Sequence, residues 1–360
     1  MLTFLIAAAG TGGHVFPGLA VGEALMELGV AQADIVYVGG DRLEATVYPA
    51  QGFRFLPVEL SGLRRSLSTS NLRLPGVVLR ARREITAELG RSDVRVVLGM
   101  GGYVTIPAGM AARQRRVPLF NAEQNAEAGL ANRITARWAR ATFTSFPVTG
   151  GLHEGTWVGN PVRRPFWEFD RAGLRSEAME RYGLEPDVPV LGVFGGSLGS
   201  GVLNDAAATM VAGWEGRPLQ VVHLTGEAHI GSMSERSSSG DVHWHRVDFE
   251  DRMELFYAVA DLVVARAGGA VAELTATATP SVLVPGTFGS GGHQLGNARA
   301  LSRAGAAEIL AEEEIDDLPD LVARLLHDEP TRKAMRAAAS DISKPDAALT
   351  IGRAMIEAAR

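Results

Sequence analysis

The 360-residue sequence contains no cysteine, which excludes disulfide bonds, thiolate nucleophiles and cysteine-ligated zinc and suits a reducing cytoplasm. It also lacks any apolar run long enough to span a bilayer, and its first ten residues lack the basic n-region of a secretory signal. We therefore expect a buried first strand in a protein that is soluble or peripheral to a membrane. Basic runs studded with aromatic residues are missing as well, which argues against a nucleic-acid partner.

The net charge of -6 is distributed unevenly between the two halves of the chain. Residues 1–160 carry 16 Arg against 12 Asp and Glu, whereas residues 161–360 carry 19 Lys and Arg against 29 Asp and Glu. A basic half joined to an acidic half indicates that the first half faces something anionic.

Apolar, strand-like runs alternate with helical patterns along the whole chain, which predicts an α/β fold with parallel sheets covered by helices. The pattern restarts after a turn-rich stretch near residues 159–161. We therefore expect two Rossmann-like, doubly wound domains facing a cleft, with boundaries at 1–160 and 161–344. A final helix in 345–360 is expected to pack back on the first domain. Expected strands cover 2–8, 34–38, 94–98, 117–121 and 141–144, then 190–194, 219–224, 242–246, 262–265, 281–284 and 306–310.

The first glycine-rich loop, AAAGTGGHVFPG (7–18), joins a strand to a helix that we expect to begin at Pro17. Its glycines allow a ligand to approach the backbone, but the spacing fits neither a dinucleotide fingerprint nor a P-loop. His14 follows this loop directly. A lone histidine is most often structural, yet a neutral imidazole here can accept a proton from an attacking hydroxyl, and we favour that interpretation.

Three loops in the second half of the chain also join an expected strand to an expected helix. In GVFGGSLGSGVLN (192–204), Ser197 can bind a phosphate oxygen or cap the next helix, and the role of Asn204 is open from the pattern alone. Glu273 can hold ribose hydroxyls or complement a helix dipole. His293 and Gln294 begin a helix, where neutral polar groups suit a sugar.

Polar side chains also follow two neighbouring strands of the first half. Tyr103 lies in GMGGYVTIPAG (99–109), and Glu123, Gln124 and Asn125 lie in NAEQNAEAGLANR (121–133). Glycine, amide and carboxylate without metal-type spacing are typical of a carbohydrate site.

Taken in order, the motifs GTGGHVFPGLAV, GMGGYV, EQN, GNPVR, GGSLG and HQLGNA resemble those of the MurG family over nearly the whole chain. The resemblance implies a GT-B architecture and an inverting transfer of N-acetylglucosamine from UDP-N-acetylglucosamine to the 4-hydroxyl of undecaprenyl-linked N-acetylmuramyl-pentapeptide. It implies no covalent intermediate, cofactor or obligatory metal, and no DxD motif is present. It also implies a place in peptidoglycan synthesis at the cytoplasmic face of the membrane, with cell-wall and cell-division proteins as further partners.

The resemblance also assigns residues. It places Thr11, Gly12, Gly13, His14 and Asn125 near the transferred sugar and the acceptor. It places Arg163, Ser197, Glu273, His293 and Gln294 on the donor, and Glu250 at the position beside the uracil that is usually aliphatic. We expect His14 to be the base, with Glu123 as the rival. Two further departures are Ala122 before EQN and a loop one residue shorter between Arg266 and Glu273.

A lipid-anchored acceptor requires a surface that faces the membrane. The segment 71–85 combines apolar and basic residues, which is the pattern of an interfacial helix, although a solvated basic face gives the same pattern. The candidate residues are Arg73, Leu74, Val77, Val78, Arg80, Arg82, Arg83 and Ile85, joined by Arg113, Arg115 and Arg116.

Other functions share this architecture. A nucleotide-sugar epimerase or another lipid glycosyltransferase would differ in its product, and a catalytically silent membrane scaffold would bind cell-wall partners without turnover. An NAD-dependent oxidoreductase is disfavoured by the glycine spacing.

Overall fold

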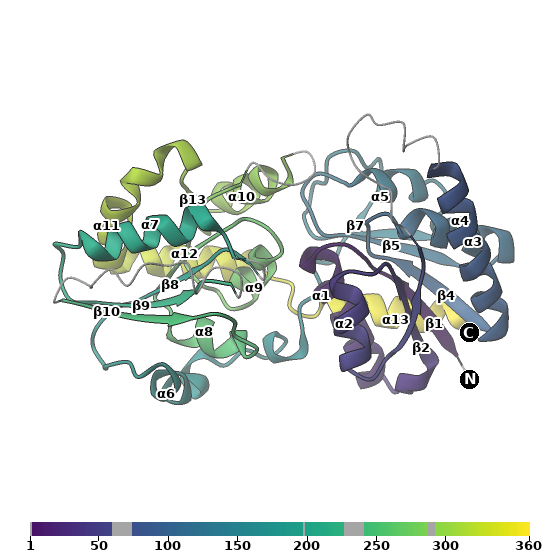
Figure 1. Cartoon of the computed structure of the whole chain (residues 1–360), viewed down its shortest axis with the longest axis horizontal. Coiled ribbons are helices and arrows are strands. Elements are labelled where there is room, and N and C mark those ends of the chain that lie inside the picture. The colour runs from purple at the N-terminus through teal and green to yellow at the C-terminus, as the bar shows by residue number, and fades with distance from the viewer. Residues whose placement is uncertain (1, 60–73, 197–198, 227–240, 287–291) are drawn as a thin grey trace. The chain divides into compact units, whose positions relative to one another are not determined.

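The computed structural model describes residues 2–59, 74–196, 199–226, 241–286 and 292–360. The chain divides into two compact units: unit 1 is Met1–Arg164 with Lys344–Arg360, and unit 2 is Pro165–Ser343. Each unit is built around one parallel sheet with helices on both of its faces (Figure 1). Among the described residues, no helix has both the length and the apolar character that crossing a membrane requires.

The sheet of unit 1 has the strand order β3-β2-β1-β4-β5-β6-β7 in the described part of the chain. The order reverses between β1 and β4, as in a Rossmann fold, and ligands of such folds bind beyond the strand ends at that point. Its strands are β1 Thr3–Ala7, β2 Ile35–Gly39, β3 Arg54–Pro57, β4 Val94–Gly99, β5 Leu119–Glu123, β6 Ala141–Thr144 and β7 Thr156–Trp157.

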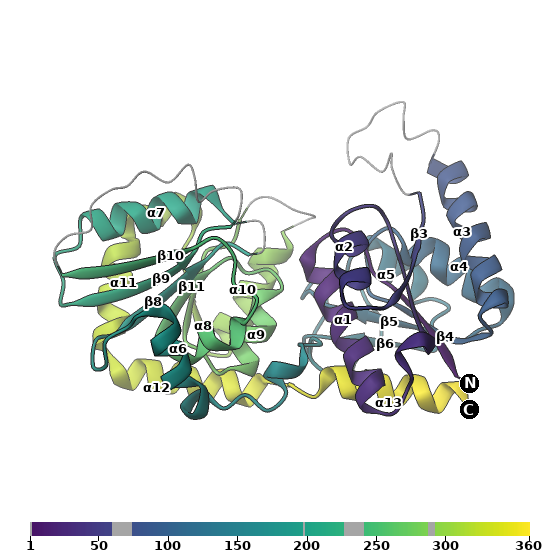
Figure 2. The ribbon, with the colours of Figure 1, turned by 60° about the horizontal axis from the view of Figure 1, so that its bottom comes forward.

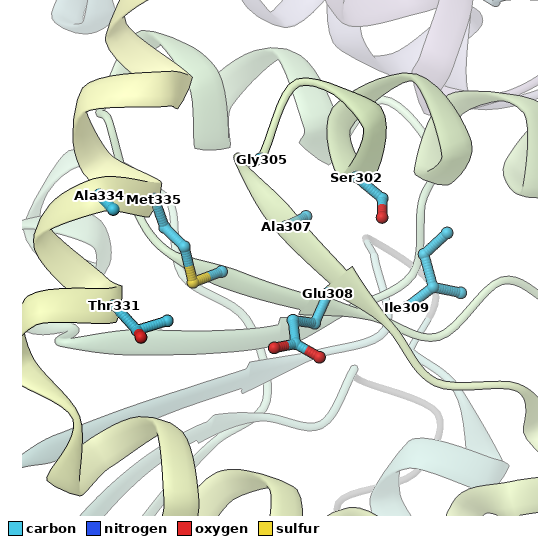
Figure 3. Close-up of a pocket in the computed structure, with 8 residues that line it drawn as sticks. All are labelled: Ser302, Gly305, Ala307, Glu308, Ile309, Thr331, Ala334 and Met335. Atoms are coloured by element: carbon cyan, nitrogen blue, oxygen red, sulfur yellow. The ribbon is translucent and has the colours of Figure 1, made fainter.

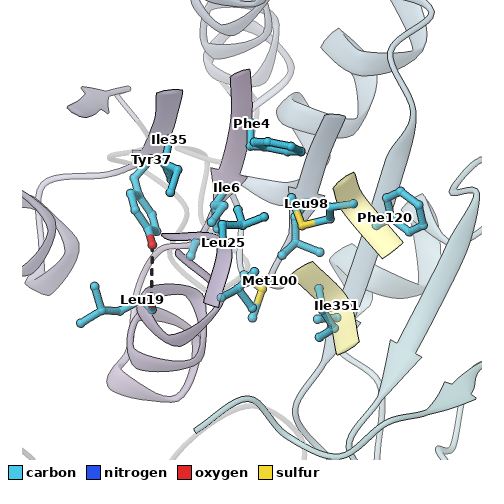
Figure 4. Close-up of a cluster of buried hydrophobic side chains, with 14 of the residues drawn as sticks. Phe4, Ile6, Leu19, Leu25, Ile35, Tyr37, Leu98, Met100, Phe120 and Ile351 are labelled. Atoms are coloured by element: carbon cyan, nitrogen blue, oxygen red, sulfur yellow. Dashed lines mark hydrogen bonds between the residues drawn. The ribbon is translucent and has the colours of Figure 1, made fainter. Parts of the chain in front are cut away.

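Strand β1 shows why this sheet is buried on both faces. Phe4 and Ile6 pack into one hydrophobic cluster, and Leu5 and Ala7 pack into another on the opposite face. Alternate residues of a strand point to opposite faces, so a continuous apolar run fits a sheet that is covered twice. Figure 4 shows the first of these clusters, with side chains from neighbouring strands in contact.

The helices of unit 1 divide between these two faces. Helices α1, α2 and α13 contribute to the cluster around Phe4, whereas α3 and α4 contribute to the cluster around Leu5. Figures 1 and 2 show α13 beside α1, where Gly352 allows a close approach because a Cβ there would lie 3.0 Å from Leu28 Cδ1. The helices are α1 Gly12–Glu27, α2 Leu43–Ala50, α3 Leu74–Arg91, α4 Thr105–Arg115, α5 Leu130–Thr135 and α13 Ala347–Ala359.

One local expectation for unit 1 was wrong, and one helix was missed. Helix α1 begins at Gly12, so Pro17 lies inside the helix and not at its first position. The glycines permit the earlier start, and Pro17 leaves only the carbonyl of Gly13 without its usual helical donor. Helix α2, which the sequence did not predict, begins directly after Asp41 and Arg42, two exposed residues in a bend.

Unit 2 repeats the arrangement with the strand order β10-β9-β8-β11-β12-β13 in its described part. Here the order reverses between β8 and β11. The strands are β8 Val190–Phe194, β9 Leu219–Leu224, β10 Val242–Val247, β11 Leu262–Ala265, β12 Ser281–Leu283 and β13 Ala307–Ile309. The helices are α6 Arg171–Tyr182, α7 Gly201–Ala212, α8 Met253–Val259, α9 Ala270–Ala276, α10 His293–Arg303, α11 Leu318–His327 and α12 Glu329–Ile342.

Candidate functional site

In unit 1 the loops after β1 and β4 touch at the point where the strand order reverses. A Cβ on Gly102 would lie 2.7 Å from the carbonyl oxygen of Ala9, so a larger residue cannot occupy this position without moving a backbone. Gly101 and Gly102 have φ values of +88° and +72°, which glycine adopts at little cost. The two glycine loops therefore form one surface at the carboxyl edge of the sheet.

His14 lies on this surface, in the first turn of α1. Thr11 is the N-cap residue with extended backbone, and its carbonyl accepts from His14 N at 3.0 Å and from Val15 N at 3.1 Å. The hydroxyl Oγ1 of Thr11 lies 3.4 Å from His14 Nδ1. The imidazole packs on Gly101, because a Cβ there would lie 3.0 Å from Nε2. A proton on Nδ1 shared with Thr11 would leave the lone pair on Nε2, the nitrogen beside the β4 loop.

Glu123, at the end of β5, is 3% exposed and accepts four hydrogen bonds. Oε1 accepts from Asn125 N at 3.0 Å and from Asn125 Nδ2 at 3.1 Å. Oε2 accepts from Gly129 N at 3.0 Å and from Asn132 Nδ2 at 2.8 Å. These bonds use the acceptor capacity of the carboxylate to organise the loop between β5 and α5.

Asn132, on α5, connects this loop to His14 and was missed from the sequence. It is 1% exposed, and a Cβ on Gly101 would lie 3.4 Å from its Nδ2. Glu123, Asn132, Gly101 and His14 therefore form a continuous series of contacts. The only signal for Asn132 was a polar residue on the buried face of a short helix.

The other candidates of unit 1 differ in their surroundings. Tyr103 is 39% exposed just before α4, and Thr11 is exposed beside His14. Gly12 and Gly13 form the first residues of α1. Arg163 is paired with Glu23 of α1, with Nε 3.4 Å from Oε1, and Glu23 Oε2 also accepts from the backbone N of Arg164 at 3.1 Å.

In unit 2 the loops after β8 and β11 occupy the corresponding position. Ser197 lies outside the described residues, whereas Ser200 is the N-cap of α7. Gly196 and Gly199, which precede Ser200, have φ values of +96° and +75°. Both lie in the left-handed region, which glycine adopts at little cost. The capping role that we considered for Ser197 is performed by Ser200, whose Oγ accepts from Leu203 N.

Arg266, at the end of β11, ties several loops of unit 2 together and was not selected from the sequence. Its guanidinium donates to Ser200 Oγ at 3.1 Å and to the carbonyl of Val284 at 3.1 Å, and it pairs with Glu312. Gln294 lies beside it and accepts from Gly286 N at 2.8 Å. These contacts hold the start of α10 near the reversal point.

Glu273 and His293 lie on neighbouring elements of unit 2. Oε2 of Glu273 accepts from the hydroxyl of Tyr257 at 2.8 Å. Burial, followed by the charge of Glu273, raises the pKa of Tyr257 well above its usual value, so the tyrosine stays a donor. His293 is the first residue of α10, and its buried Nδ1 has no hydrogen-bond partner among the described residues.

Asn204 and Glu250 are two further candidates, and their buried side chains have protein partners. Asn204 is 2% exposed, donates to the carbonyl of Thr225 at 3.0 Å and has Oδ1 3.0 Å from His223 Nε2. Glu250 is 3% exposed and accepts from Arg181 at 2.9 and 2.8 Å and from Tyr182 at 2.6 Å. Protein partners thus satisfy both side chains, and the expected ligand contacts of these two residues stay predictions.

A hollow over the edge strand β13 is a separate feature of unit 2 (Figure 3). Its lining comes from α10, β13 and α12, including Ser302, Glu308 and Met335. None of the candidate residues that the structure describes lines it. Among the described residues, no group of three or more acidic or histidine side chains is arranged to hold a metal ion.

Comparison with known proteins identifies the class to which this fold and these loops belong. The N-terminal domain of glycosyltransferase family 28 matches residues 4–144, and the C-terminal domain of the same family matches residues 190–351. The two units thus correspond to the two domains of a glycosyltransferase.

Individual relatives narrow the class. The UDP-N-acetylglucosamine—N-acetylmuramyl-(pentapeptide) pyrophosphoryl-undecaprenol N-acetylglucosamine transferase of Mycolicibacterium paratuberculosis is 38% identical over 370 residues, covering 100% of this chain and 89% of the relative. The protein of that name from Dechloromonas aromatica is 38% identical, with 99% of each chain covered. A crystal structure of Acinetobacter baumannii MurG superposes with a TM-score of 0.80 at 26% identity, covering 99% of this chain and 100% of that one. The chain belongs to the MurG family of glycosyltransferases.

Proposed function

We propose that this chain transfers N-acetylglucosamine from UDP-N-acetylglucosamine to an N-acetylmuramyl-pentapeptide carried on pyrophosphoryl-undecaprenol. The observation that carries the proposal is the match to transferases of that name over essentially the whole chain. The reaction completes the lipid-linked disaccharide from which peptidoglycan is built.

His14 is the proposed general base in unit 1. The acceptor hydroxyl must lose a proton as it attacks the anomeric carbon, and a positioned imidazole accelerates such a step by about 10²- to 10⁴-fold. The location of His14 on the joined glycine loops supports this role. Glu123 is the weaker candidate because its carboxylate already accepts four hydrogen bonds. We therefore propose that Glu123 orders the loop that carries Asn125.

We propose that unit 2 and Arg163 bind the UDP-sugar donor. The turn around Gly196 and Gly199 leads into α7, a 12-residue helix whose first amides suit a diphosphate. Amides and a guanidinium that meet the developing charge of departing UDP would stabilise the transition state. Glu273, His293 and Gln294 are proposed to contact the ribose and the sugar, and Ser197 to contact a phosphate.

Product analysis tests the proposed function. We expect the chain, UDP-N-acetylglucosamine and a lipid-linked muramyl-pentapeptide to yield UDP and a β-1,4-linked disaccharide on the lipid. Conversion of the UDP-sugar to its epimer without acceptor would establish the epimerase alternative. Another acceptor used in preference would establish a different lipid glycosyltransferase, and binding without turnover would establish a scaffold.

Helix α3 supplies the proposed contact with an anionic membrane at the cytoplasmic face. Leu79 is 43% exposed, and Leu79, Arg82, Arg83 and Arg115 line one groove between α3 and α4. Val77, Val78 and Arg80 continue the same helix, with Arg80 paired to Glu59. Arg73 and the side chain of Leu74 lie outside the described residues, and Ile85 is buried in the core and does not belong to this surface.

Vesicle binding tests this membrane contact. Each surface arginine contributes about 1 kcal/mol to binding of anionic lipid, so reversing one charge weakens binding by roughly tenfold or more. We expect Arg83→Glu to lose sedimentation with anionic vesicles at low salt, while Arg353→Glu, an exposed site on α13, keeps most of it. Equal loss in both variants, or no binding by the unmodified chain, would contradict the assignment to α3.

A further inference from the structure

Helix α2 carries a buried carboxylate that links two glycine-rich loops of unit 1. Glu44 is 1% exposed. Its Oε2 accepts from Gly10 N, in the loop after β1, at 3.1 Å, and its Oε1 accepts from Gly40 N, in the loop after β2, at 2.9 Å. Each oxygen thus satisfies a backbone donor from a different loop.

The end of β2 and the loop after it leave room for this side chain. A Cβ on Gly39 would lie 2.6 Å from Glu44 Cγ, and a Cβ on Gly40 would lie 3.0 Å from Oε1. Any larger residue at Gly39 would therefore displace the carboxylate, since Cγ is not the free end of the side chain. The two glycines leave the space through which Glu44 reaches Gly10.

Tyr48 makes a second connection from the same helix, one turn after Glu44. Its hydroxyl donates to the carbonyl of Val15 at 3.1 Å. The ring is buried and stacks on Tyr37 with centroids 3.9 Å apart. Burial, followed by the charge of Glu44, raises the pKa of Tyr48 well above its usual value, so its hydroxyl stays protonated and able to donate.

These two contacts lie on either side of His14 in the chain. We propose that Glu44 and Tyr48 are positioning residues that fix the segment from Gly10 to Val15 and thereby aim the His14 imidazole. The inference rests on the proposed role of His14 as the base. It adds α2, which lies outside the glycine-rich motifs in the sequence, to the elements that position the catalytic histidine.

The chemistry of Glu44 explains why a carboxylate is needed at this position. A carboxylate presents two acceptor oxygens to two N–H groups, whereas a glutamine presents one oxygen and one NH2 group. In Glu44→Gln, the backbone N–H of Gly10 or of Gly40 would face the glutamine NH2 group, which is itself a donor. The loop after β1 would then lose its hydrogen bond to α2 or shift. Displacements on the order of 1 Å near a reacting group can cost about 10²-fold in rate.

Kinetics of two conservative variants test the proposal. We expect Glu44→Gln and Tyr48→Phe to lower kcat by about 10- to 100-fold, with the KM for the UDP-sugar within about threefold of the unmodified value. Thr46→Ala, on the exposed face of the same helix, should match the unmodified chain in both parameters. Tyr48→Phe removes a single oxygen, so it carries the test if Glu44→Gln fails to fold.

A double-variant comparison shows whether Glu44 acts through His14. If it does, Glu44→Gln lowers kcat much less in a His14→Ala background than in the unmodified chain, because coupled residues are not additive. Equal losses in both backgrounds, or wild-type kcat in both single variants, would overturn the proposal.

Hydrogen exchange at the Gly10 amide tests the tether, which is the hydrogen bond from Gly10 N to Glu44, independently of the role of His14 as base. We expect faster exchange of this amide in Glu44→Gln and no change in Thr46→Ala. Unchanged exchange in Glu44→Gln overturns the tether whatever His14 does. Near-normal turnover of His14→Ala, with the exchange result as expected, would reject the proposed base and leave the tether established.

Discussion

Glu123 shows how the role of one side chain depends on partners that come from elsewhere in the chain. The sequence identified it as a polar residue at the end of a strand, and its chemistry allowed a catalytic base. Its four hydrogen bonds, two of them from backbone amides, support the proposal that it orders the loop between β5 and α5. Asn132 and Glu44 are also buried and hydrogen-bonded, and they were not identified because nothing local in the sequence reveals where their side chains point.

Replacing Glu123 by glutamine should destabilise unit 1. The variant would keep one acceptor oxygen and would set an NH2 group against N–H donors, so we expect a loss of about 1–3 kcal/mol in the free energy of unfolding. Urea denaturation of Glu123→Gln against Glu154→Gln, an exposed carboxylate in the same unit, measures the difference. Equal stability of the two variants would show that the network contributes nothing to folding.

At the scale of helices and strands, the apolar runs predicted the central strands of both sheets because these runs are buried on both faces. Strand β3 escaped prediction because its burial is only partial, and β7 because it is two residues long. Helix α2 was missed because it is short and follows a glycine pair. The loops after β1, β4 and β5 were located correctly by their position after a strand, whereas side-chain partners such as Arg181 with Glu250 depend on tertiary packing.

The contact between His223 on β9 and Asn204 on α7 gives a prediction for how the stability of the fold depends on pH. His223 is fully buried on β9, and burial, followed by the charge of Arg246, lowers its pKa to about 4. The unfolded chain takes up the proton near pH 6.5 and the folded one does not, so stability falls as the pH falls through that window.

We expect this group to remove about 2 kcal/mol of unfolding free energy between pH 7 and pH 5. The variant His223→Gln, which keeps an NH group for Asn204, should lose correspondingly less over that range, while the exposed-site control His153→Asn should follow the unmodified chain. Parallel pH profiles for His223→Gln and the unmodified chain, measured by urea denaturation, would count against a neutral buried His223.

At the scale of the whole molecule, the two ends of the chain belong to the same unit. The last helix, α13, adds Ile351 and Met355 to the cluster around Phe4, and both side chains are fully buried. Figure 4 shows Ile351 among side chains carried by the strands of unit 1. The folding of unit 1 therefore depends on residues at both ends of the sequence.

Truncation of Ile351 should destabilise unit 1 selectively. Removing a buried isoleucine side chain to alanine costs about 2–5 kcal/mol, whereas Ile356→Ala, at a partly buried position on the same helix, should cost less. Hydrogen exchange resolved by segment should show faster exchange in β1 and α1 but not in β8 and β11. Uniform acceleration in both units would mean that they unfold as one.

We propose that His14, in the first turn of α1 beside the loops after β1 and β4, is the base in transfer of N-acetylglucosamine to the lipid-linked acceptor. A single-turnover measurement on His14→Ala, with UDP-sugar binding determined separately, tests this role. We predict that the rate of disaccharide formation falls by about 10²- to 10⁴-fold while the affinity for the UDP-sugar stays within about threefold. Near-normal turnover with intact UDP-sugar binding would contradict the claim.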